Sequence, residues 1–148
     1  MTITSKINAR RLFTGGVAAG LLLNIVTAVG NSTVFKPDFL AWADGLGEHL
    51  HPPSQGNQIL LWVVMCFIDA FLGVWLYAGL RPRFGAGPKT AFLAGVSVWV
   101  IGRFCVALDM LGLGVFPLQI LIGQSILGLV AILPSILLGA WIYREGAQ

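Results

Sequence analysis

Charged and chemically reactive side chains are scarce in this chain. Charged residues make up 10% of its 148 residues, whereas soluble domains average about 25%. The two cysteines, Cys66 and Cys105, do not form a CxxC pair. A disulfide relay therefore has no support, and both thiols are expected to act as small hydrophobes. The sequence also holds no nucleophile motif, phosphate-binding loop or HExxH zinc motif, so no motif supports an enzymatic function.

Both histidines, His49 and His51, lie outside the long apolar segments. A haem held by two intramembrane histidines is therefore not expected, and the sequence predicts no cofactor. Asp44 and Glu48 stand nearby, and two histidines with two carboxylates can bind zinc or copper. Their spacing matches no metal motif, so we interpret these four residues as part of a solvated polar loop.

What the chain does have is apolar length. Hydrophobic residues make up 57% of it, more than a fold of this size can remove from water. A bilayer solvates such surface directly, and a helix crosses the hydrocarbon core in about 20 residues. Continuous apolar runs favour helices over a barrel. We predict a single all-α, polytopic domain with four transmembrane helices, over residues 12–34, 59–80, 91–113 and 117–143.

Basic residues predict the orientation of these spans. Lys and Arg concentrate in the cytoplasmic loops of membrane proteins. Here one side of the spans carries Lys6, Arg10, Arg11, Arg81, Arg83, Lys89 and Arg144, and the other side carries only Lys36. Both chain ends are therefore predicted to lie in the cytoplasm. The net charge of +3 is an orientation signal and does not indicate nucleic-acid binding.

The connections between the spans differ in length. A compact turn rich in Gly and Pro is expected over residues 81–88. The first outer loop, residues 35–58, is long, and Asp38 is available there as an N-cap. Apolar side chains recur in this loop at helical spacing, at Phe39, Trp42, Leu46 and Leu50. The pattern predicts a short helix lying at the outer interface.

The ends of the second and fourth spans resemble each other. Residues 72–77 (LGVWLY) match residues 138–143 (LGAWIY). The first and third spans align more weakly, through Phe13, Gly16 and Val17 against Phe92, Gly95 and Val96. Two hairpins with the same in-out-in course form a parallel repeat. We predict a bundle of two repeated hairpins, with chance similarity between apolar segments as the alternative.

Polar residues near the middle of the spans form the candidate site. At 1.5 Å per residue, Asn24, Asp69 and Arg103 each lie about 16 to 18 Å from the cytoplasmic end. The repeat adds Ser135 as the counterpart of Asp69. A lone charge at this depth costs at least about 2.5 kcal/mol, so we predict an Asp69–Arg103 ion pair whose hydrogen bonds Asn24 completes. The pair either fixes helix register or serves as a proton pathway, anion pathway or headgroup-binding site.

Three further polar residues, Asp109, Gln119 and Gln124, lie in the outer halves of the third and fourth spans. They form either an outer polar vestibule or hydrogen bonds between helices. The sequence alone leaves both interpretations open.

Three segments carry a resemblance to a known family: residues 15–24 (GGVAAGLLLN), 77–91 (YAGLRPRFGAGPKTA) and 139–145 (GAWIYRE). They resemble a family of small bacterial hypothetical membrane proteins with four helices. The resemblance covers most of the chain outside the first outer loop. It implies a bacterial inner membrane and supplies no activity. Members often carry an acidic residue shortly after the Asn of the first helix. Here the nearby polar residue is Thr27, which argues against a general acid or base on that helix.

Three functions compete. The first is a non-enzymatic interaction protein or accessory subunit, which associates with itself or with other membrane subunits through small residues such as Gly15, Ala19 and Gly20. The second is a small oligomeric transporter or channel for a proton, ion or small polar solute, using Asp69 and Arg103. The third, a lipid- or quinone-acting enzyme, has no supporting motif. The sequence favours the first, with the second as the alternative, and the lipid bilayer surrounds the protein in each case.

Overall fold

The computed structural model describes residues 7–46 and 55–143 of the chain. Within these ranges the fold is helical and contains no strand. Four stretches are long and apolar enough to cross a membrane: Ala9–Gly45, Gly56–Phe84, Pro88–Gly112 and Leu118–Ile142. This confirms the predicted all-α fold with four helices that can span a bilayer, as in a multi-pass membrane protein.

The first span does not stop where its apolar run ends. Helix α1 (Ala9–Gly30) continues through a π-helical turn, η1 (Asn31–Phe35), into α2 (Lys36–Leu46). The backbone stays right-handed helical across both joints. Pro37 lacks the N–H that an α-helix would bond to the carbonyl four residues earlier. The wider π turn ends two residues before this proline and includes Thr33, whose carbonyl would have accepted the missing bond.

Helix α2 is the helix predicted in the first outer loop, but it continues the first span. The prediction of Asp38 as an N-cap is wrong, because Asp38 lies inside a helix that begins earlier. The part of the combined helix from Ala9 to Gly45 has 37 residues, which is about 55 Å at 1.5 Å per residue. A hydrocarbon core is about 30 Å thick, so part of this helix must extend beyond it. An interfacial position for α2 stays a prediction, and Leu50 lies outside the described residues.

The second span, α3 (Gln55–Phe84), also runs further than predicted. It passes through Pro82, which the sequence assigns to a turn. Proline has a helical φ, so the helix can run through it to Phe84 with the loss of one hydrogen bond. The turn begins at Gly85, whose φ of 81° suits glycine. The Thr90 hydroxyl then donates to the Gly85 carbonyl at 2.7 Å.

The third span consists of three parts. Helix α4 (Pro88–Trp99) leads into a second π turn, η3 (Val100–Phe104), and then into α5 (Cys105–Gly112). The side chain of Trp99 fixes this span to α6, because its Nε1 donates to the Ser125 carbonyl at 2.8 Å.

A tight turn with Gly114 at a φ of 65° leads into the last helix, α6 (Leu118–Ile142). Helix α2 packs over this turn. The Trp42 ring lies 4.3 Å from the Phe116 ring, and its Nε1 donates to the Val115 carbonyl at 3.0 Å. The end of the first span at α2 is thereby fixed to the connection between α5 and α6.

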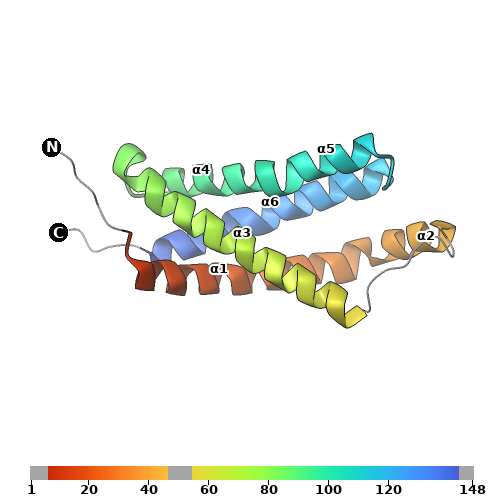
Figure 1. Ribbon diagram of the computed structural model, residues 1–148, viewed down its shortest axis with the longest axis horizontal. Helices are drawn as coiled ribbons and strands as arrows, with labels where there is room; N and C mark the ends of the chain where they lie inside the picture. Colours follow the sequence, from red (N-terminus) through yellow and green to blue (C-terminus); the bar gives the residue numbers. More distant parts are fainter. Residues whose placement is uncertain (1–6, 47–54, 144–148) are drawn as a thin grey trace.

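Helices α3 and α6 form the centre of the bundle. They contact each other, and each also contacts both α1 and α4 (Figure 1). Helices α1 and α6 approach each other closely, since a Cβ on Gly15 would lie 2.7 Å from the carbonyl oxygen of Gly139. Small residues permit such close contacts between membrane helices.

The small residues that the sequence suggests for association are used inside the chain. Gly15, Ala19 and Gly20 are all buried, and the Phe67 ring covers Gly20. This prediction of an exposed association face is therefore wrong. The sequence could not reveal it, because small residues serve contacts within a chain and between chains equally well.

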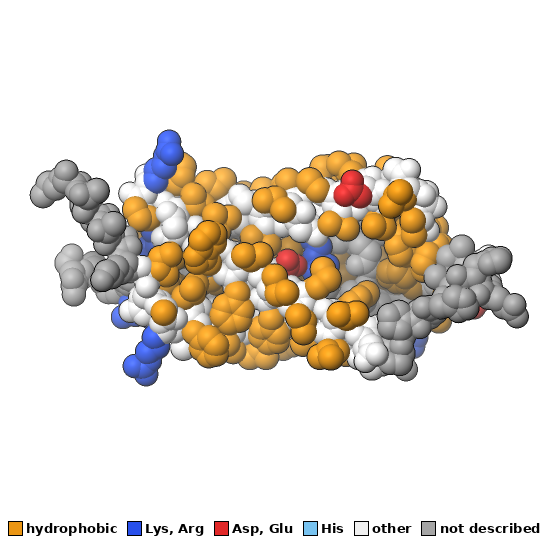
Figure 2. All heavy atoms as spheres, viewed as in Figure 1, with side chains coloured by type: hydrophobic (Ala, Val, Ile, Leu, Met, Phe, Trp, Pro, Cys, Tyr) orange, Lys and Arg blue, Asp and Glu red, His pale blue; other side chains and the backbone are white. Residues whose placement is uncertain are grey.

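The two ends of the bundle differ in charge. The start of α1, the α3–α4 turn and the end of α6 lie together at one end, and α2 lies with the α5–α6 turn at the other (Figure 1). Figure 2 shows Lys and Arg side chains gathered at the first end and a largely hydrophobic middle. We name these the inner and outer ends, following the predicted orientation. The orientation in the membrane itself stays a prediction.

Matching residues of the predicted repeat have matching environments. Tyr77 and Tyr143 are each 2% exposed, and their rings meet edge to face at 6.1 Å. Trp75 and Trp141 are both exposed. The π turn at Arg103 has no counterpart in the regular helix of the first span that holds the matching Asn24. The repeat therefore stays a prediction.

Candidate functional site

An ion pair joins the second and third spans near the middle of the bundle. Arg103 Nη2 lies 3.1 Å from Asp69 Oδ2, so the structure confirms the predicted contact. Asp69 stands halfway along α3, and Arg103 belongs to η3. The side chains of Asp69 and Arg103 keep 12% and 23% of their surface exposed. The pair is thus neither sealed inside the protein nor on its outer surface.

The π turn sets the position of Arg103. The Cys105 N–H bonds to the Val100 carbonyl, five residues earlier. Such a turn contains one residue more than an α-turn and changes the face that α5 presents relative to α4. No proline follows this turn in α5, in contrast to the turn that ends at Phe35, so the sequence offers no signal for it. Single π turns inside α-helices are frequent at functional sites, which makes this turn a second mark of the site besides its charge.

Two glycines make room for the pair. The aliphatic stem of Arg103 packs on Gly128 of α6, where a Cβ would lie 3.1 Å from the Arg103 Cγ. On the other side, a Cβ on Gly102 would lie 3.4 Å from Asp69 Oδ1. The stem of the arginine is therefore held against a neighbouring helix that has no side chain at the point of contact.

The other two residues of the predicted midplane cluster do not join the pair. The Asn24 amide donates to the Gly20 carbonyl of its own helix at 2.8 Å, so the prediction that it completes the hydrogen bonds of the pair is wrong. Ser135 is fully buried and donates to the Ala131 carbonyl at 2.7 Å. Both side chains satisfy their polar groups one helical turn back, an option that depth and helical spacing do not reveal.

Much of the hydrogen-bonding capacity of Arg103 is unused by the pair. A guanidinium carries five N–H donors, and the contact with Asp69 uses Nη2. Nε is buried, and it has no hydrogen-bond partner among the residues that the structure describes. An unpaired buried donor costs free energy, and the terminal nitrogens of the guanidinium keep further N–H donors beyond the contact with Asp69.

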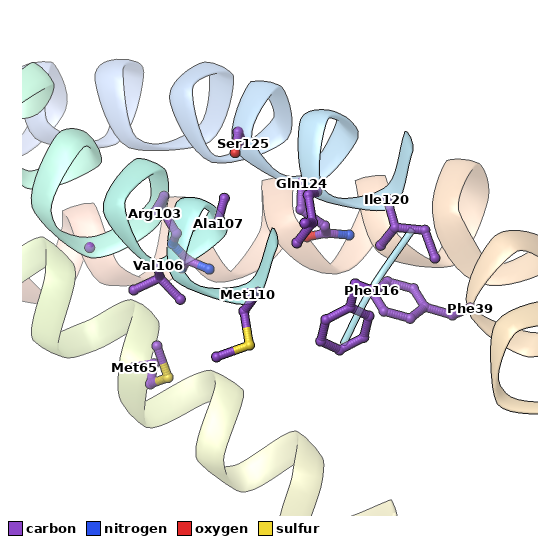
Figure 3. Close-up of a pocket in the computed structure, with 12 residues that line it drawn as sticks. Phe39, Met65, Arg103, Val106, Ala107, Met110, Phe116, Ile120, Gln124 and Ser125 are labelled. Carbon is purple, nitrogen blue, oxygen red and sulfur yellow. The ribbon is translucent and has the colours of Figure 1, made fainter. Parts of the chain in front are cut away.

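A partly open cavity of about 180 Å³ borders the pair on its outer side. It lies where α3 diverges from α5 (Figure 1), and α6 and α2 complete its wall. Figure 3 shows the guanidinium of Arg103 projecting beside Val106, towards the space between Met65 and Met110. The lining consists of Phe39, Met65, Gly102, Arg103, Val106, Ala107, Met110, Phe116, Ile120, Leu121, Gln124 and Ser125.

One residue of the predicted outer vestibule lines this cavity. Gln124 forms part of the wall, and its Nε2 donates to Asn31 Oδ1 of η1 at 2.7 Å. Asp109 and Gln119 are exposed and lie outside the lining, so the vestibule of three residues is wrong as a cluster. Among the described residues, the alternative of hydrogen bonding between helices is correct for Gln124.

Sequence reasoning missed the apolar wall and the partner of Gln124. Asn31 lies two helical turns after Asn24 on the same helix face. Its polarity could therefore have indicated a partner for Gln124. Met65, Met110 and Phe39 gave no such signal, because an apolar residue in a sequence can face either lipid or a cavity. Only the divergence of α3 from α5 separates the two cases.

The core between the ion pair and the inner end is tightly packed, although a separate cavity of about 210 Å³ lies between α3, α4 and α6 near the inner end itself. Val74, Ile132 and Ile136 are fully buried there, and a Cβ on Gly73 would overlap the Ile136 side chain. Towards the inner end, the guanidinium carbon of Arg81 lies 6.0 Å from the centre of the Tyr77 ring. The cavity that Arg103 lines therefore extends from the ion pair towards the outer end.

The weak metal candidates gain no support from the described residues. Asp44 is exposed on α2, while Glu48, His49 and His51 lie outside the described ranges. Within residues 7–46 and 55–143, no group of three or more His, Cys, Asp or Glu side chains could hold a metal ion.

Comparison of the chain with protein-family models, with curated proteins and with solved structures finds no match. The resemblance to small bacterial membrane proteins therefore stays a prediction, and the argument for function rests on the site itself.

Proposed function

We propose that the protein is a small transporter that binds a polar or charged solute beside the Asp69–Arg103 ion pair. One observation carries the proposal: a cavity of about 180 Å³ in the outer half of the bundle reaches Arg103. Charged residues inside membrane spans are costly and often mark substrate or ion pathways. A pair that served only to fix helix register would need no open space beside it.

The packed core on the inner side of the ion pair favours a carrier over an open channel. Val74, Ile132 and Ile136 are fully buried between the pair and the inner end. A carrier that alternates between two states keeps one side closed while the other is open around a central site. The arrangement of cavity and core corresponds to the outward-open state of such a carrier.

Cysteine labelling tests access to the cavity. In a variant with Cys66→Ala and Cys105→Ala, Ala107→Cys places a thiol in the cavity wall. A negatively charged, membrane-impermeant methanethiosulfonate is then applied to right-side-out vesicles. We expect reaction at position 107, because a thiolate forms only where water reaches the sulfur.

The matched control is Leu108→Cys in the same variant. Leu108 is the next residue of α5, is 52% exposed and lies outside the cavity lining, so its thiol would face lipid. We expect it to react about tenfold more slowly or not at all, because an apolar environment keeps the thiol protonated. Equal rates at the two positions, or no reaction at 107, would refute an outward-open cavity.

The same variant tests the transport step from the other side. In inside-out vesicles the Ala107→Cys thiol should react slowly, because the inner half must open for part of the time. If the thiol at position 107 did not react at all from the inner side over hours, the protein would bind a solute without transporting it.

A second candidate function, association between copies of the chain, is favoured by the outer part of α3. Side chains on every face of this helix are exposed from Ile59 to Met65, and all are apolar. A helix that packs on only one side normally buries one stripe. An apolar stretch with no packed face is suited to a neighbouring membrane protein, here a second copy of the chain.

Disulfide crosslinking tests this association. Leu61→Cys and Ile122→Cys, each in the variant without native cysteines, place thiols at positions of similar exposure, 56% and 50%. We expect a crosslinked dimer through position 61 and none through position 122. A monomer by light scattering, together with no dimer at position 61, would exclude this function.

A further inference from the structure

We infer that the solute is a small amphipathic anion in which a carboxylate is joined to a compact apolar group. The inference rests on the proposed solute-binding function and adds the chemical class of the solute. Its carboxylate would meet Arg103 at the inner limit of the cavity. Its apolar part would lie against Met65, Met110 and Phe116.

The polar groups in the cavity wall are mainly hydrogen-bond donors. Arg103 is the charged residue of the lining, and the ion pair uses only its Nη2, which leaves further N–H donors on the terminal nitrogens of the guanidinium. Gln124 commits one amide N–H to Asn31, and a side-chain amide has a second one. Ser125 adds a hydroxyl to the wall. A hydrogen-bond acceptor in the cavity suits such donors, whereas a cation would meet the positive charge of Arg103.

Asp69 itself is not among the residues that line the cavity. The salt bridge is a single contact from Nη2 to Oδ2. A guanidinium can bind a second carboxylate through its remaining N–H groups, often with two parallel bonds. Arg103 can therefore hold a solute carboxylate without releasing Asp69.

The volume of the cavity limits the size of the solute. An apolar cavity of about 150 Å³ binds benzene, while pockets for drug-sized ligands start at about 300 Å³. At about 180 Å³, this cavity fits one ring or a short branched chain. Methionine side chains adapt their shape to different apolar groups, so Met65 and Met110 suit a solute of this kind.

Three probes of nearly equal shape test the inference: benzoate, benzyl alcohol and benzylammonium. The purified full-length protein in detergent is titrated with each, and its thermal unfolding temperature is measured. A ligand that binds the folded state raises this temperature with concentration. We expect benzoate to raise it and benzylammonium to leave it unchanged, with benzyl alcohol at least about tenfold weaker than benzoate because it lacks the charge-assisted bond.

Two kinds of variant connect the effect to the cavity. The double variant with Asp69→Asn and Arg103→Gln removes both charges together and leaves neither one unpaired, so it should fold. Its affinity for benzoate should fall about tenfold or more. Met110→Trp should block the cavity and abolish binding. Leu111→Trp, at an exposed position outside the lining, should leave binding unchanged.

The outcomes separate this inference from the proposed function. Equal effects of benzylammonium and benzoate, or benzoate binding that survives Met110→Trp, would overturn the assignment of an anion at Arg103. So would the absence of any effect from all three probes. None of these results changes the labelling of Ala107→Cys, which decides independently whether the cavity is open to the outer side.

Discussion

The aliphatic stem of Arg103 lies directly on Gly128, a residue with no side chain. A Cβ at position 128 would lie 3.1 Å from the Arg103 Cγ, closer than the 3.5 Å or so at which carbon atoms attract best. The salt bridge from Arg103 to Asp69 depends on the path of that stem. A small residue on α6 therefore sets the position of the Arg103 charge on η3, and with it the ion pair to α3.

Gly128→Ala should destabilise the protein. The stem of Arg103 would have to shift by a few tenths of an ångström, and the 3.1 Å contact with Asp69 would lengthen. Overpacking of this kind costs about 1–3 kcal/mol. We expect a lower free energy of unfolding in detergent, measured by thermal or chemical denaturation.

The matched control is Gly79→Ala in α3, where a Cβ would meet no atom within 4 Å. Alanine is the better helix former by up to about 1 kcal/mol, so this variant should be as stable as the wild type or slightly more so. Equal stability of the Gly128→Ala and Gly79→Ala variants would show that the Arg103 stem has room to move.

The ion pair should be coupled in a double-mutant cycle. Removal of one partner from a buried pair leaves the other charge unpaired, at a cost of about 3–5 kcal/mol. The partial exposure of both side chains places Asp69→Asn and Arg103→Gln near the low end of that range. The double variant should be more stable than either single variant.

Thermal unfolding of the four proteins in one detergent measures this coupling. Losses that simply add in the double variant would mean that the two charges do not interact in the folded protein. A stable double variant without transport would separate the role of the pair in the solute site from its role in folding.

The sequence predicted the fold and the ion pair because both follow from the cost of exposing groups to lipid. Four apolar runs of sufficient length must be helices, and Asp69 and Arg103 must find a partner at similar depth. These arguments need no knowledge of neighbouring helices. They hold for any packing that allows the two charges to meet.

The remainder of the site depends on packing that the sequence does not encode locally. Asn24 had a polar group at the right depth, yet its own helix satisfied it. Arg103 reaches its position through a π turn, and Gly128 resembles every other glycine in an apolar run. The cavity arises because α3 diverges from α5, which is a relationship between helices and has no counterpart in one segment of sequence.

The orientation can be tested with reporters at the two turns. A periplasm-active phosphatase fused after Gly114, in the α5–α6 turn, should be active, and one fused after Gly87, in the α3–α4 turn, should not. The prediction follows from the basic residues at the inner end. Activity at Gly87 with none at Gly114 would reverse the orientation, and the cavity would then open towards the cytoplasm.

The contact between Gly15 and Gly139 should be the least tolerant position of the bundle. A Cβ on Gly15 would lie 2.7 Å from the Gly139 carbonyl oxygen, and a Cβ on Gly139 would lie 2.9 Å from the Gly15 carbonyl oxygen. These two carbonyl oxygens are backbone atoms, which cannot rotate away as a side chain can, and a Cβ on Gly139 would also lie 2.5 Å from Val74 Cγ2. Gly15→Ala should therefore cost about 3 kcal/mol, at the upper end of the range for overpacking.

The control for this prediction is Gly112→Ala, because a Cβ at position 112 would meet no atom within 4 Å. The double variant with Gly15→Ala and Gly139→Ala provides a sharper test. Once one Cβ has separated α1 from α6, the second adds little strain, so the combined loss should be smaller than the sum of the two single losses. Fully additive losses would mean that each glycine packs independently, and a Gly15→Ala variant as stable as Gly112→Ala would exclude the close crossing of α1 and α6.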